Sequence, residues 1–216
     1  MNYFEISYTV IGGLAIFFLG LVFLSEASID RDTIRRIPTK ATTNRIVAVL
    51  AGVGITAFVQ SSSITTVMTV SLVNAGLMEL RQALGVIIGA NIGTTITGWI
   101  ISIRVGSYGL LFLGLGILPM LAANRAWLKT LGKTLVALGM IFVGLEFMAD
   151  AFRPLRTDPG FISYLYIFDA QSLRSLIACV LMGCLLTMIV QSSSAMLGIT
   201  ITLASTGVID FDTAVG

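Results

Sequence analysis

Apolar segments follow one another along most of this chain, and this pattern restricts its fold more than any other feature. They lie near 8–25, 46–59, 62–77, 83–101, 106–123, 134–149, 175–190 and 194–209. Hydrophobic residues make up 56% of the chain and charged residues only 11%, whereas a soluble domain has about 45–50% apolar and about 25% charged residues. No polar stretch is long enough to build a soluble domain. The sequence therefore predicts an all-α integral membrane protein.

Two of the apolar stretches are interrupted by the same polar tetrapeptide. Gln60-Ser61-Ser62-Ser63 follows the segment 46–59, and Gln191-Ser192-Ser193-Ser194 follows 175–190. A spanning helix needs about 20 residues, and the arms on either side of each tetrapeptide are shorter. We therefore expect two re-entrant helical hairpins with a QSSS sequence at each tip. The segments 83–101 and 106–123 are long enough to span, as are 8–25 with its flanks and 134–149 if it starts near Leu128.

The two hairpins belong to an internal repeat. A shift of 131 places residues 52–85 on 183–216, with identical residues at 12 of 34 positions and no gap. Upstream, a shift of 124 places FLGLVF (18–23) on FVGLEF (142–147). The repeating unit is therefore one long helix, a linker and a QSSS hairpin.

Basic residues predict that the two repeats have opposite orientations. The linkers at 30–45 and 124–133 are rich in Lys and Arg, while 150–172 holds only Arg153 and Arg156 with three aspartates. The positive-inside rule places the first two linkers in the cytoplasm and the third outside. Three crossings and one hairpin in the first unit also make the second unit start on the other side. The result is an inverted-repeat transporter with its N-terminus outside, and with Arg104, Arg153, Arg156 and Arg174 on the outer side.

The first repeat is expected to cover 1–123 and the second, incomplete, 124–216. The first contains Asn91-Ile92-Gly93-Thr94-Thr95, a polar patch that predicts a broken helix. A packing kink is the alternative. The counterpart of this patch would start near position 220, so we expect the chain to be C-terminally incomplete.

Several classes of chemistry are disfavoured by the residues present. The chain has no histidine, so Ser-His-Asp and Cys-His catalysis and zinc sites of the HExxH type are excluded. Cys179 and Cys184 lie in an apolar run and are expected to pack between helices. Neither QSSS tip has a lysine or carboxylate beside its serines, so the protein is not expected to be an enzyme. Glu146 is an intramembrane acid whose role, buried hydrogen bonding or coupling, stays open.

The tips have the chemistry of an ion site. Half-helix ends meet near the membrane midplane in inverted-repeat transporters, and a helix N-terminus offers free N–H groups and a partial positive charge. That environment suits a tetrahedral anion such as phosphate. Serine, threonine and glutamine oxygens are also ligands for a hard cation such as sodium. Helix capping and interhelical hydrogen bonding are the structural alternative for a QSSS sequence.

The sequences GITAFVQSSSITTVMTVSLVNAGLM, GANIGTTITGWI and LLTMIVQSSSAMLGITITLASTGVI resemble the type II sodium/phosphate cotransporters in their bacterial form. The resemblance implies sodium-coupled symport of inorganic phosphate by alternating access, with no cofactor besides the coupling ion. It implies phosphate binding by Gln60, Ser61, Ser62, Ser63, Gln191, Ser192, Ser193 and Ser194. It implies sodium binding by Gln60, Ser63, Thr65, Thr66, Asn91, Thr94, Thr95, Gln191 and Ser194. The second hairpin has Ala195, Met196 and Leu197 in place of Ile64, Thr65 and Thr66, so its supply of hydroxyl groups is smaller.

The expected partners are phosphate, sodium, the lipid bilayer, a second copy in a homodimer and a PhoU-like cytoplasmic domain or protein; no nucleic acid is expected. The expected location is the bacterial inner (cytoplasmic) membrane, as a multi-pass protein. Two alternatives remain open: transport of another small anion or export of phosphate, and a membrane phosphate sensor or scaffold without flux.

Overall fold

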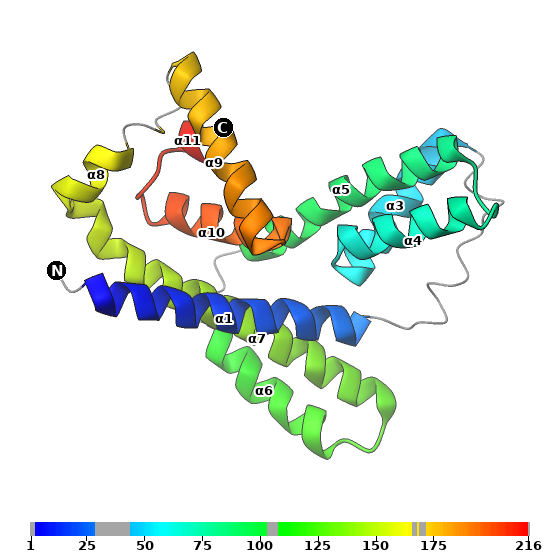
Figure 1. Cartoon of the computed structure of the whole chain (residues 1–216). Helices are drawn as coiled ribbons and strands as arrows, with labels where there is room; N and C mark the ends of the chain where they lie inside the picture. Colours follow the sequence, from blue (N-terminus) through cyan, green and yellow to red (C-terminus); the bar gives the residue numbers. More distant parts are fainter. Residues whose placement is uncertain (1–2, 29–43, 103–107, 166–167, 169–171, 216) are drawn as a thin grey trace. The chain divides into compact units, whose positions relative to one another are not determined.

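The computed structural model describes residues 3–28, 44–102, 108–165, 168 and 172–215. These residues are overwhelmingly helical, and strands are lacking among them, which confirms the all-α class (Figure 1). Four helices are long and apolar enough to cross a membrane: Tyr3–Ala27, Leu80–Ser102, Ala126–Thr157 and Leu173–Val190. The basic linker with Arg31, Arg35, Arg36 and Lys40 lies outside the described residues, as does Arg104.

Apolar side chains cover the outside of the helices, as expected of a protein in a lipid bilayer. Trp99 is 74% exposed, Leu110 71% and Ile46 69%. Monomeric soluble proteins rarely expose apolar surface on this scale. The exposed residues and the four long apolar helices together indicate a membrane protein.

The chain forms two compact units. One comprises residues 21–100 and 114–137, the other 1–20, 101–113 and 138–216. Several helices contribute residues to both units, among them α1 (Tyr3–Ser28), α6 (Gly109–Ala122) and α7 (Ala126–Phe152). The expected division into repeats at 123/124 describes sequence similarity and stays a prediction.

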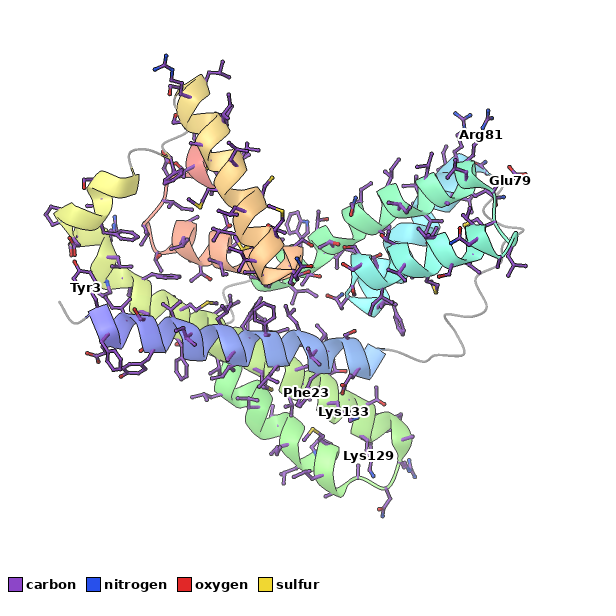
Figure 2. The ribbon with its side chains drawn as sticks, in the orientation of Figure 1. Tyr3, Phe23, Glu79, Arg81, Lys129 and Lys133 are labelled. Atoms are coloured by element: carbon purple, nitrogen blue, oxygen red, sulfur yellow. The ribbon has the colours of Figure 1, made fainter. Side chains whose placement is uncertain are left out.

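The unit 21–100/114–137 contains α3 (Arg45–Val59), α4 (Ser62–Asn74) and all but the last two residues of α5 (Leu80–Ser102). Glycines allow α3 and α5 to pack backbone against backbone. A Cβ on Gly52 would lie 2.1 Å from the Val86 carbonyl oxygen, and one on Gly89 would lie 2.0 Å from that of Val49. Small residues at such positions are what close helix packing in membranes requires. In the same unit, Lys129 and Lys133 lie on α7 near its junction with α6 (Figure 2).

The helix α5 corrects one expectation. It runs without interruption from Leu80 to Ser102, so the Asn91–Thr95 patch does not break it. Its glycines serve the close approach to α3 instead, because a Cβ on Gly93 would lie 2.7 Å from the Val53 carbonyl oxygen. The hydroxyls of Thr94 and Thr95 donate to carbonyls of their own helix, at 3.2 and 2.7 Å.

The unit 1–20/101–113/138–216 contains α8 (Pro159–Leu165), α9 (Leu173–Val190), α10 (Ser193–Ser205), α11 (Phe211–Val215) and the short 3-10 helix η3 (Arg153–Thr157). Here α1 crosses α7 where a Cβ on Gly144 would lie 2.5 Å from the Gly13 carbonyl oxygen. The fully buried Phe17 presents its ring to Gly198 on α10. The second hairpin is therefore seated against α1 within this unit.

Two helix lengths differ from expectation. The segment 106–123 was expected to span, but α6 has only 14 residues, contains Pro119 and turns directly into α7. Residues 103–107 lie outside the described part. The arm before the second tip was expected to be too short to cross the membrane. With 18 residues, α9 is long enough to cross, so a re-entrant course for this arm stays a prediction. The expected start of the helix over 134–149 near Leu128 is confirmed by α7.

Asp158 joins the start of α1 to α8. Its carboxylate accepts a hydrogen bond from the Tyr3 hydroxyl at 2.5 Å and from the backbone N–H groups of Gly160 and Phe161, at 2.8 and 3.3 Å. The Tyr3 hydrogen bond, followed by the one from Phe161, lowers the pKa of Asp158 from its ordinary value of 3.8. These bonds favour the charged carboxylate.

We therefore expect Asp158 to stabilise this junction in a pH-dependent way. A lowered folded-state pKa contributes stability above pH 3.8, and this is lost as the pH falls through the lowered pKa. The thermal midpoint of the parent protein in detergent should exceed that of Asp158→Asn well above pH 3.8, and the gap should close below the lowered pKa. A gap that does not change with pH would contradict the role of the charge.

Candidate functional site

The two QSSS tips have the same backbone conformation. Gln60 ends α3 with φ 59° and ψ 24°, and Gln191 ends α9 with φ 56° and ψ 22°. Ser61 and Ser192 follow in extended conformation, with φ −148° and −147°. Each serine hydroxyl then caps the next helix by accepting from the backbone N–H three residues on, Ile64 at 3.3 Å and Ala195 at 3.2 Å.

The likeness extends to the far end of each hairpin. Gly76 and Gly207 have positive φ angles of 69° and 71°. The N–H of Leu77 donates to the Leu72 carbonyl at 2.9 Å, and that of Val208 donates to Leu203 at 3.0 Å. Each of these residues in the first hairpin corresponds to its counterpart in the second at the repeat shift of 131. The helix α11 also occupies the register of the first residues of α5, with Phe211 on Leu80.

Gln60 and Gln191 are the non-glycine residues with positive φ in the described part of the chain. The left-handed region costs an ordinary residue about 1–2 kcal/mol, and glycine is the usual choice there. Strained backbone of this kind collects at functional sites. Both tips therefore carry a glutamine at a position where glycine would have less backbone strain.

Each tip presents a set of hydrogen-bond donors. Within the described residues, the hydroxyls of Ser62 and Ser63 at α4, and of Ser193 and Ser194 at α10, make no hydrogen bond. The first N–H groups of a helix lack intrahelical partners and carry a partial positive charge. Ser61 and Ser192 accept with their oxygens and keep a hydroxyl proton to donate. Each tip can therefore offer several neutral donors to an anion.

The first tip is supported by a polar network between its arms. Thr56 on α3 donates to the hydroxyl of Thr65 on α4 at 3.0 Å, and Thr65 donates to the Ser61 carbonyl at 3.0 Å. Both threonines are fully buried. In the same unit, the Ser25 hydroxyl on α1 donates to the Val59 carbonyl at 3.0 Å, next to the turn.

Both the nitrogen and the oxygen of the Gln60 side-chain amide are hydrogen-bonded. Its nitrogen donates to the Ala57 carbonyl, and its oxygen accepts from the hydroxyl of Thr97 on α5 at 2.7 Å. Thr97 is 2% exposed. At the second tip, the nitrogen of Gln191 donates to the Met188 carbonyl in the same way.

The structure groups only part of the predicted sodium set. Gln60 and Thr65 lie within the hydrogen-bonded network of the first tip. Asn91 and Thr95 are exposed on α5, off the face whose glycines contact α3. Thr94 and Thr66 are half-buried. In the second hairpin Met196 takes the place of Thr65, so it cannot reproduce the bond to Thr56.

Sequence reasoning missed Thr56, Thr97 and Ser25. Thr56 had a usable signal, because the shift of 131 places it on the identical Thr187. Thr97 follows Gly93 and Gly89 at intervals of four residues, which places all three on one face of α5. Ser25 carries no such signal, since its contact with Val59 depends on tertiary packing.

Comparison with known proteins gives a consistent set of relatives. The profile of the family described as "Na+/Pi-cotransporter" matches residues 16–150. "Putative inorganic phosphate export protein YjbB" of Escherichia coli K12 is 28% identical over 181 residues, which are 84% of this chain and 33% of that protein. YqeW of Bacillus subtilis is 30% identical over 162 residues, 75% of this chain and 51% of that protein.

A mammalian relative shares a shorter region. "Sodium-dependent phosphate transport protein 2A" of Ovis aries is 40% identical over 60 residues, 28% of this chain and 9% of that protein. The chain spans a third of the length of the first relative and about half of the second. No solved structure matches the chain significantly.

Proposed function

Because this chain belongs to the Na+/Pi-cotransporter family, we propose that it carries inorganic phosphate across the cytoplasmic membrane in symport with sodium. The observation that supports this most is the pair of left-handed glutamines, each followed by a serine-capped helix with free donors. Names of relatives add support, since one refers to inorganic phosphate export and another to sodium-dependent phosphate transport.

Both tips are proposed to contact both ions, through different groups. Phosphate is proposed to accept from the free hydroxyl and N–H groups of Ser61–Ser63 and of Ser192–Ser194, at two helix N-termini. Sodium is proposed to use oxygens of Gln60, Ser63, Thr65 and Thr66 at the first tip and of Gln191 and Ser194 at the second, because hard cations prefer oxygen ligands. Asn91, Thr94 and Thr95 of α5 stay proposed sodium ligands as well, although Asn91 and Thr95 lie off the face of α5 that contacts α3.

Alternating access would follow from two repeats inserted with opposite orientation. The matching tip geometry supports this proposal, and so does the asymmetry of basic residues. The inner membrane, an outside N-terminus, a homodimer and a PhoU-like cytoplasmic partner stay predictions. Cysteine accessibility at an added N-terminal cysteine, measured in intact cells, tests the orientation.

Export of phosphate is the second candidate, and it rests on the name of the Escherichia coli relative. Cells expressing the intact chain distinguish the directions. Import predicts faster entry of labelled phosphate in sodium medium than in potassium medium. Export predicts faster loss of label from preloaded cells. Competition by sulfate or a carboxylate tests whether another anion is the substrate.

A further inference from the structure

Gln60 has a defined amide orientation because of its two partners. The Ala57 carbonyl can only accept, so the group that faces it must be the amide nitrogen. The amide oxygen therefore faces Thr97, and because this oxygen can only accept, the Thr97 hydroxyl must donate. One rotamer of Gln60 satisfies both bonds, and a flipped amide would lose both.

The donor itself is held in place. Thr97 is 2% exposed and follows Gly89 and Gly93 at four-residue intervals on α5. Those glycines let α5 approach the α3 backbone so closely that a Cβ on either would overlap it. The close packing of α3 and α5 therefore fixes the distance between the Thr97 hydroxyl and the turn that carries Gln60.

We propose that Thr97 is a positioning residue, which aims the amide oxygen of Gln60 for the coupling sodium ion. This rests on the proposed function. An amide oxygen has two lone pairs, so it can accept from Thr97 and still bind a cation. A ligand already oriented before binding avoids the loss of rotamer freedom that binding would otherwise cost.

At the second tip the described residues offer no counterpart of this bond. Gln191 makes the equivalent contact to its own helix, and its side chain is exposed. Our proposal therefore concerns the first tip alone.

The test uses sodium-dependent stabilisation of the purified intact chain, because a ligand that binds the folded state raises its thermal midpoint. Thr97→Val keeps the shape of the side chain and removes the donor. The sodium concentration giving half of the full stabilisation should rise about fivefold, the effect of losing one ordinary hydrogen bond. Thr97→Ser keeps the hydroxyl and should return the parent value. Thr134→Val is the control, since that hydroxyl donates to Thr130 of its own helix at 3.0 Å.

Flux supplies the second measurement. In proteoliposomes Thr97→Val should raise the KM for sodium and leave the maximal rate near that of the parent, because only the orientation of a ligand is lost. An unchanged half-saturating sodium concentration in folded Thr97→Val, or failure of Thr97→Ser to restore it, would overturn this inference alone. Absence of any sodium effect on the parent would overturn the proposed function and the inference with it.

Discussion

Gly52→Ala should prevent stable packing of α3 against α5, although it adds only one methyl group. The new Cβ would lie 2.1 Å from the Val86 carbonyl oxygen and 2.8 Å from its carbonyl carbon. Even close carbon–oxygen contacts in proteins are about 3.3 Å or longer. The obstacle is helix backbone, so the two helices must separate. Overpacking of this kind costs about 1–3 kcal/mol or more, and we expect a lower thermal midpoint and poor recovery as a monodisperse protein.

Gly54→Ala is the matched control on the same helix. A Cβ there meets nothing within 4 Å, and alanine favours helix over glycine by about 1 kcal/mol. Its thermal midpoint should equal or exceed that of the parent. Equal stability of the Gly52 and Gly54 variants would show that α3 and α5 do not pack as described.

Gln60→Gly and Gln191→Gly should each abolish most transport while leaving the fold intact. Glycine adopts the left-handed conformation of these positions without strain, which offsets the loss of the side-chain hydrogen bonds. We expect each thermal midpoint to stay near that of the parent. Each substitution removes one proposed contact to an ion, which should weaken ion binding by about 1.5–3 kcal/mol. Sodium-driven phosphate flux should therefore fall about 10- to 100-fold in each variant.

The control for these variants is Ser205→Ala, at the far end of α10. Its hydroxyl donates to the Thr202 carbonyl of the same helix at 3.0 Å, away from the tip. Flux through Ser205→Ala should match the parent. If the two glutamine variants transported as fast as Ser205→Ala, the left-handed glutamines would be strained for no functional reason, and the site assignment would fail.

Much of the fold could be predicted from the sequence because lipid imposes a simple rule on it. The positions of α1, α3, α4, α5, α7, α9 and α10 follow from apolar runs, since an exposed backbone in lipid must be helical. The turns at Gln60 and Gln191 followed from the repeated polar tetrapeptide. The short α8 and η3 were missed because seven and five residues give little periodic signal.

The error at Asn91–Thr95 shows where sequence reasoning fails. Glycine and polar residues in a membrane helix are compatible with either a break or a close contact, and sequence alone does not say whether another backbone lies opposite. The positions of Val49 and Val53 decide the question. Thr97 was missed for a similar reason: its importance lies in a 2.7 Å contact with a residue 37 positions away.

Sodium-driven accumulation of labelled phosphate in proteoliposomes is the decisive measurement for sodium–phosphate symport by this chain. The intact chain is reconstituted, and phosphate is measured inside under an inward sodium gradient and under a matched potassium gradient. We expect accumulation above the external concentration with sodium only, and its loss in Gln60→Gly and Gln191→Gly. Equal entry under both gradients, or accumulation that survives both substitutions, would contradict it.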